Sequence, residues 1–125
     1  MTHALLVAVL GGLGAATRFW VDGAIRARGR TVLPVATITI NVTGSLLIGL
    51  VVGAHLHLGL PATWQLLLAT GFCGGYTTFS AAAVETVRLA QTGDRARALA
   101  NLAGTMLLAV AAAAAGLGLT ALWVA

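Results

Sequence analysis

The part of the chain best suited to chemistry is residues 71–80, which read G-F-C-G-G-Y-T-T-F-S. The run lies inside a hydrophobic segment of the kind that forms a membrane helix. Its glycines weaken such a helix, because each costs about 1 kcal/mol relative to alanine. The threonine and serine hydroxyls that follow can bond to nearby backbone groups instead of supporting the helix. A break inside a membrane persists only where it is buried in protein or lines a wet cavity, and it exposes carbonyl and N–H groups that bind ions. The stretch therefore predicts an ion site at a helix break.

The composition of the chain is typical of an integral membrane protein. The 125 residues are 59% hydrophobic and 8% charged, whereas soluble domains average about 25% charged residues. The N-terminus lacks the pattern of a removable signal peptide, so we expect the first hydrophobic run to remain. Cys73 is the only cysteine, and we interpret it as a small buried apolar residue. With no metal-ligand cluster and no nucleophile–base pair, the sequence does not indicate an enzyme.

Four long hydrophobic runs predict an all-α membrane protein with a single four-span domain over residues 1–125. About 20 apolar residues are enough for a helix to cross the hydrocarbon core of a bilayer. Because the glycine-rich stretch falls within the third run, we expect the third helix to be broken near its middle. The approximate spans are 4–21, 33–54, 62–88 and 99–123.

Arg18 is a candidate functional residue in the first span. It shares one helix face with Gly11, Gly14 and Ala15, and small residues on a face allow another helix to approach closely. An arginine close to a span end either extends to the interface in a structural role or draws ions into a vestibule. Both interpretations of Arg18 remain open at this point.

Amide and hydroxyl side chains form polar positions on the second and fourth spans. Thr37, Asn41 and Ser45 recur every four residues, and Asn101 and Thr105 lie one turn apart. A buried asparagine needs hydrogen-bond partners, because an unpaired polar group in hydrocarbon is costly. Asn41 therefore either links helices or lends its amide donors to a permeating anion, directly or by orienting a partner.

The arginines predict the orientation of the chain in the membrane. Four spans place the first and third connectors on one side and the termini with the middle connector on the other. Arginines in short loops mark the cytoplasmic side. We therefore predict a multi-pass protein of the cell (inner) membrane with both termini outside. The arginines in or flanking the first and third connectors are Arg26, Arg28, Arg30, Arg88, Arg95 and Arg97, and the opposite side has none.

Three segments resemble the Fluc/CrcB family of fluoride channels along nearly the whole chain. They are G-G-L-G-A-A-T-R at 11–18, T-I-T-I-N-V-T-G-S at 37–45 and G-F-C-G-G-Y-T-T-F-S at 71–80, and Glu85 follows at the family's spacing. The resemblance implies a four-helix subunit of an antiparallel dimer that conducts fluoride passively out of the cell and lowers fluoride toxicity. It also implies a structural sodium ion at the dimer centre, held by backbone carbonyls that map onto Gly74 and Thr77.

The resemblance also assigns residues to a fluoride pore. The pore phenylalanine maps onto Phe79, the asparagine of the second helix onto Asn41 and the arginine of the first helix onto Arg18. Asn and Thr hydrogen-bond donors can replace the water around a small anion, as can the electropositive edge of an aromatic ring. Plain packing remains an alternative interpretation of Phe79. The expected pore set is completed by Ser80, Asn101 and Thr105.

Two positions depart from the family pattern. Ala82 stands where a second phenylalanine is usual, and Ala109 stands where the fourth helix usually carries another hydroxyl. The arginine bias should also fix a single orientation, whereas an antiparallel dimer needs both. We therefore expect that this subunit pairs with an oppositely oriented homologue, which supplies the missing groups.

Two other classes of protein have similar size and hydrophobicity. A four-span small-molecule/proton antiporter needs a carboxylate buried in the membrane, but Asp22 and Glu85 lie near span ends, and Glu85 is expected to pair with Arg88. A non-transporting assembly factor would explain the small-residue faces. It would not explain a glycine-rich break deep inside a span.

Overall fold

The computed structural model describes residues 1–29, 31 and 33–125. Arg30, one of the arginines in the predicted cytoplasmic connector, and Val32 lie outside the described residues. Helices are the only regular secondary structure in the described residues, and four helical stretches are long and apolar enough to cross a membrane. The predicted all-α, four-span architecture with an interrupted third span is therefore confirmed. The elements are α1 (Thr2–Arg26), α2 (Val35–His57), α3 (Ala62–Gln65), π-helical η1 (Leu66–Cys73), α4 (Gly74–Tyr76), α5 (Phe79–Gln91) and α6 (Arg95–Val124).

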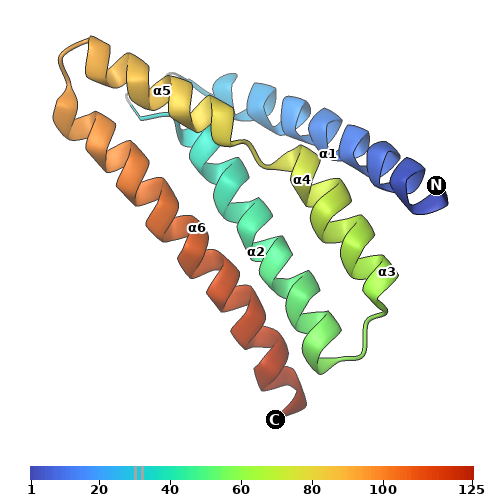
Figure 1. The fold of residues 1–125 in the computed structure, drawn as a ribbon. Coiled ribbons are helices and arrows are strands. Elements are labelled where there is room, and N and C mark those ends of the chain that lie inside the picture. The colour runs from blue at the N-terminus through green and yellow to red at the C-terminus, as the bar shows by residue number, and fades with distance from the viewer. Residues whose placement is uncertain (30, 32) are drawn as a thin grey trace.

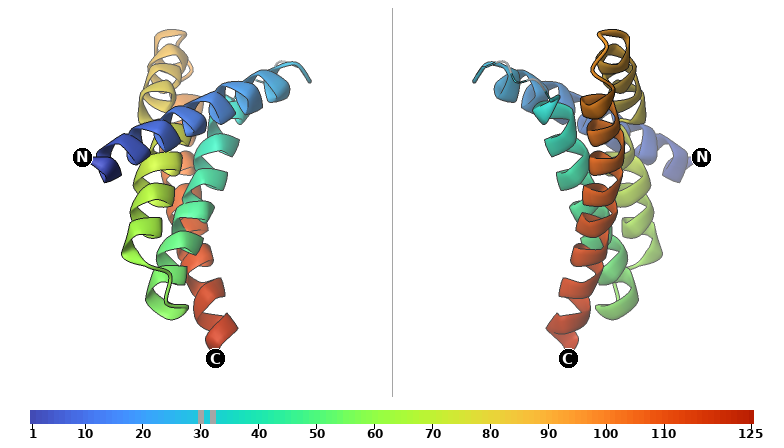
Figure 2. Two further views of the ribbon diagram at one scale, coloured as in Figure 1. Left: turned by 90° about the vertical axis from the view of Figure 1, so that its right-hand side faces the viewer. Right: turned by 90° about the vertical axis from the view of Figure 1, so that its left-hand side faces the viewer.

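The helices form a bundle in which α1 crosses the others at a steep incline (Figure 2). Both α1 and α5 end at the same end of the bundle, where α2 and α6 begin (Figure 1). The connector between α2 and α3 lies at the opposite end, together with the C-terminus. The two arginine-bearing connectors thus share one end of the molecule, as a four-span topology requires.

Small residues determine how closely α2 and α6 pack. A methyl group added at Gly49 would overlap the carbonyl of Ala113, and one added at Gly53 would overlap the Thr120 hydroxyl. Gly116 faces the backbone of α2 in the same way. Gly49 and Gly53 therefore allow the backbones of α2 and α6 to approach closely, as small residues commonly do between membrane helices.

The third span breaks later than its glycines would suggest. Gly71, Gly74 and Gly75 are helical, whereas Thr77 and Thr78 have extended backbones, with φ/ψ of −77°/157° and −146°/117°. Threonine, branched at Cβ, fits an extended backbone well. The Thr78 hydroxyl also caps α5 by accepting the N–H of Ala81 at 3.2 Å. The predicted break within residues 71–80 is confirmed, and it lies at the two threonines of that run, whereas the glycines stay helical.

Two glycines of the third span, Gly71 and Gly75, serve close packing against α1. A Cβ at Gly75 would overlap the carbonyl of Gly11, and a Cβ at Gly14 would overlap the carbonyl of Phe72. This confirms the predicted small-residue face of the first span. Cys73, between these contacts, has no exposed surface, so its interpretation as a buried apolar residue is also confirmed.

Candidate functional site

The broken backbone is held by the amide of Asn41. Its Nδ2 donates to the Thr78 carbonyl at 2.8 Å, and its Oδ1 accepts the Thr78 N–H at 2.8 Å. Because Thr78 has left the helical ladder, its N–H and carbonyl would otherwise lack partners inside the span. Asn41 therefore stabilises the break, as the interhelical interpretation predicts, and its second amide hydrogen stays uncommitted within the described residues.

A groove beside the break brings several predicted site residues together. We call it the α5–α6 groove; it has a volume of about 260 Å³ and runs between α2, α5 and α6. Phe79 lies at its edge with 83% of its surface exposed, so the ring is not held by packing within this chain. The groove is lined by Asn41, Ser45, Ile48, Thr77, Thr78, Phe79, Ala82, Ala83, Thr86, Asn101, Leu102, Thr105, Met106 and Ala109.

The polar groups of α6 differ in how their donors are used. Asn101 is 2% exposed and donates Nδ2 to the Thr86 hydroxyl at 2.8 Å, which in turn donates to the Ala82 carbonyl at 2.8 Å. Thr105 is 8% exposed, and its buried hydroxyl has no hydrogen-bond partner within the described residues. Thr105 consequently keeps a free O–H donor at the groove, whereas the hydroxyl hydrogen of Thr86 is already engaged.

The carbonyls predicted to bind sodium are free of the helical ladder. The N–H of Thr78, which would reach the Gly74 carbonyl in a continuous helix, bonds to Asn41 instead. Neither the Gly74 nor the Thr77 carbonyl accepts a hydrogen bond within the described residues. Gly74 is exposed, and a Cβ added there would meet nothing. Two carbonyl oxygens without a hydrogen-bond partner among the described residues are a donor set that suits a hard cation such as sodium.

Arg18 and Ser80 lie outside the α5–α6 groove. Arg18 donates Nε to the Gly75 carbonyl at 3.3 Å and lines a separate hollow between α1, α2 and the start of α5. The exposed Ser80 hydroxyl lies 3.3 Å from the Thr78 hydroxyl. The fluoride-pore roles assigned to these two residues stay predictions. The structure does place Arg18 against the broken helix, which supports its structural interpretation.

Two features of the site were not predicted from the sequence. Thr86 lies on the same face of α5 as Phe79 and Ala82, and this helical spacing could have identified it. Glu85 pairs with Arg26 at 2.9 Å, so the predicted pairing with Arg88 was wrong. Arg26 lies far away in the sequence, and local helix spacing could not have found it.

Fold and groove together define a class of protein: a four-span membrane protein with a broken helix beside an uncommitted hydroxyl donor. A family model described as CrcB-like protein, Camphor Resistance (CrcB), matches residues 5–117. The chain belongs to this CrcB family, as its sequence motifs predicted.

Curated relatives resemble this chain over most of its length. The chain is 50% identical to Fluoride-specific ion channel FluC 1 of Leifsonia xyli subsp. xyli, over 97% of this chain and 88% of the relative. It is 46% identical to Fluoride-specific ion channel FluC 2 of Cutibacterium acnes, over 92% and 94% of the two chains. It is 44% identical to Fluoride-specific ion channel FluC 1 of Frankia casuarinae, over 95% and 97%.

Proposed function

We propose that this chain is a subunit of a fluoride-specific ion channel that exports fluoride passively and lowers its toxicity in the cytoplasm. The observation that carries the proposal is the buried Thr105 hydroxyl, which is left without a partner in a groove shared with Phe79 and Asn41. A pore must replace the water around an ion with closely placed groups. Fluoride is small and strongly hydrated, so such a pore needs donors rather than carbonyls. The curated relatives support fluoride as the ion.

The proposed channel is an antiparallel dimer in the cell membrane. Only 6% of the apolar window of α1 and 11% of that of α6 are buried within one chain. The α5–α6 groove is also open at its edge, where Phe79 and Met106 are 83% and 61% exposed. A second subunit would close this groove into a pore, which supports an assembly in which the path runs between subunits.

Sodium is proposed as a structural ion at the centre of the assembly. The carbonyls of Gly74 and Thr77 would hold it, and a second subunit would supply the remaining oxygens. The ion would contribute a fixed positive charge near the anion path. The two carbonyls, which accept no hydrogen bond within the described residues, support this proposal, because sodium binds oxygen ligands of this kind.

We further propose that the partner subunit is an oppositely oriented homologue. Ala82 and Ala109, where the family pattern has a phenylalanine and a hydroxyl, both line the α5–α6 groove. The groove of this subunit therefore lacks an aromatic ring and a hydroxyl that would contact fluoride. The one-sided distribution of arginines supports a fixed orientation, and such a subunit needs a partner of the opposite bias to form an antiparallel dimer.

Growth of a bacterial strain without fluoride channels tests the function and the partner together. The strain would express this chain alone, a four-span homologue with the reverse arginine bias alone, or both, in medium containing fluoride. Growth restored only by the pair supports both proposals. Robust growth with this chain alone keeps the fluoride function and rejects the obligate partner. No growth with any combination of correctly inserted proteins rejects the fluoride function.

A further inference from the structure

The direction of α5 is not fixed by the helix that precedes it. The extended residues Thr77 and Thr78 separate α4 from α5, so no helical hydrogen bonds carry across the junction. Figure 1 shows α5 leaving α4 in a new direction. Asn41 holds the junction at Thr78. On one side, α5 packs against α6, where the Thr86 hydroxyl accepts a hydrogen bond from Asn101. The side of α5 that faces α1 needs an attachment of its own, further along the helix.

The carboxylate of Glu85 provides this attachment. Its Oε1 accepts a hydrogen bond from Arg26 at the end of α1 at 2.9 Å and another from Thr37 near the start of α2 at 3.1 Å. The Glu85 side chain is only 16% exposed. Its other oxygen, Oε2, is buried and has no partner within the described residues. Three helices therefore meet at one carboxylate oxygen.

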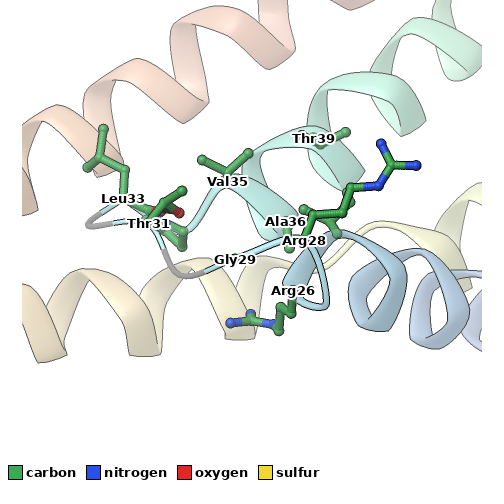
Figure 3. Close-up of a pocket in the computed structure, with 10 residues that line it drawn as sticks. Arg26, Arg28, Gly29, Thr31, Leu33, Val35, Ala36 and Thr39 are labelled. Atoms are coloured by element: carbon green, nitrogen blue, oxygen red, sulfur yellow. Dashed lines mark hydrogen bonds between the residues drawn. The ribbon is translucent and has the colours of Figure 1, made fainter.

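Asp22 orients Arg26 toward this carboxylate. The Nε of Arg26 lies 3.0 and 2.9 Å from the two carboxylate oxygens of Asp22, one turn earlier on α1. A guanidinium presents its donors in a rigid fork, so fixing Nε also directs the terminal nitrogens. Figure 3 shows Arg26 and the neighbouring Arg28 pointing in different directions from the end of α1. Arg26 is the member of this pair that reaches α5.

The contact with Arg26 acts on the face of α5 that is turned away from the α5–α6 groove, and this helix also carries Phe79. Ala81 and Glu85 are four residues apart and so share one face of α5, and Ala81 lines the hollow beside Arg26. Phe79 and Thr86 lie on another face, at the α5–α6 groove. Because the exposed Phe79 ring lacks packing of its own, its position follows the direction of α5.

We propose that Arg26 is a positioning residue for the ion path. Held by Asp22, it forms an ion pair with Glu85 and so fixes the direction of α5. The direction of α5 in turn places Phe79 at the groove. The proposal rests on the fluoride-channel function for its consequence in transport. The ion pair between Arg26 and Glu85 is itself a property of the fold. Loss of Arg26 would leave Glu85 with Thr37 as its only partner among the described residues. The side of α5 that faces α1 would then loosen, while its other side stays bonded to α6 through Thr86.

The test compares wild-type protein with Arg26→Gln, Arg26→Lys and Glu85→Gln in two assays. Hydrogen exchange in detergent should rise over residues 79–91 in R26Q and E85Q and stay unchanged over α2. R26K keeps the cation and should show smaller changes. Fluoride efflux from liposomes that hold the conducting assembly should fall about tenfold in R26Q, because small misplacements of positioned groups are costly. The double variant R26Q/E85Q should be no slower than the slower single variant.

Arg97→Gln is the matched control. Arg97 forms an ion pair of similar length, 2.8 Å, with Asp94 on the same helix turn, and both Arg26 and Arg97 are 54% exposed. R97Q should leave exchange over 79–91 and efflux unchanged, since its pair joins no other helix.

Three results would overturn the proposal. The first is unchanged exchange over 79–91 in R26Q, and the second is a rise over all helices, which indicates general destabilisation. The third is an effect of R26Q/E85Q on efflux equal to the product of the single effects, because independent sites multiply their effects. If R26Q does not fold, the same criteria apply to R26K and Glu85→Asp. If the wild-type assembly of this chain with its partner releases no fluoride, the channel function is rejected instead, while the exchange result still decides whether Arg26 and Glu85 fix α5.

Discussion

Hydroxyl and amide side chains at the groove differ in whether their donors are already used. The Asn41 amide bonds both backbone groups of Thr78, and the Thr86 hydroxyl donates to Ala82. The Thr105 hydroxyl has no partner within the described residues. Sequence spacing predicted that Asn41 and Thr105 matter, but it did not identify Thr86. It could not show which donors remain free, because that depends on contacts between helices distant in the chain.

The free hydroxyl of Thr105 leads to a prediction about flux. Thr105→Val keeps the shape of the side chain and removes the donor, so fluoride efflux should fall about tenfold or more, as expected for one lost donor to an anion. Thr105→Ser keeps the hydroxyl and should retain most of the rate. Efflux is measured with a fluoride-selective electrode on loaded liposomes. Equal rates for T105V and T105S would show that the hydroxyl does not contact the ion.

The paired amide of Asn41 leads to a prediction about stability. Asn41→Ala removes two hydrogen bonds and leaves the Thr78 backbone unpaired, which should lower the free energy of unfolding by about 2 kcal/mol. Chemical unfolding in detergent measures the change. Ser45 lies one turn further along α2 and lines the same groove, so Ser45→Ala serves as the control with an expected change of about 0.5 kcal/mol or less. Similar losses in both variants would contradict the role of Asn41 at the break.

The third span shows how far an element can be predicted from its sequence. Hydrophobic length predicted the span, and the glycine and hydroxyl run predicted an interruption. The glycines themselves remain helical, and Gly71 and Gly75 supply close contact with α1. The extended pair Thr77 and Thr78 is stabilised by Asn41 from another helix, which is a tertiary effect that local propensities do not contain. The π-helical turn over Leu66–Cys73 had no distinct signal in the sequence either.

Close packing of α1 on the broken span gives a prediction at the scale of the helix. Gly14→Ala would place a methyl group against the backbone of Phe72 and Tyr76, forcing the helices apart and lowering stability by about 1–3 kcal/mol. Gly12 on the same helix has nothing within 4 Å of an added Cβ. Gly12→Ala should therefore be neutral or stabilising, since alanine favours a helix. Thermal unfolding in detergent compares the two, and a larger loss for G12A would contradict this packing.

For the whole molecule, the arrangement of helices agrees with the division of arginines between the two ends. The ends of α1 and α5 and the starts of α2 and α6 lie together (Figure 1), so Arg26, Arg28, Arg88, Arg95 and Arg97 belong to one end. The sequence could predict this division, because the number of spans decides which connectors share a side. The proposed partner at the exposed groove could not be predicted in the same detail, because it lies outside this chain.

A reporter at the C-terminus tests the orientation. Alkaline phosphatase, which folds outside the cytoplasm, should be active when fused after Ala125, and a fluorescent protein that folds only inside should be dark. The physical basis is retention of arginine-rich connectors on the cytoplasmic side. Replacing the connector arginines with glutamine should weaken this preference and give mixed reporter signals. A bright fluorescent fusion with inactive phosphatase would contradict the proposed topology.

The most direct measurement of the proposed function is ion release from liposomes loaded with both fluoride and chloride. The liposomes contain the assembled wild-type subunits, and an ionophore compensates the charge. The fluoride-channel account predicts rapid release of fluoride, retention of chloride, and a marked loss of the fluoride signal with T105V. Retention of fluoride by liposomes with correctly inserted protein, or release of chloride at an equal rate, would contradict the account.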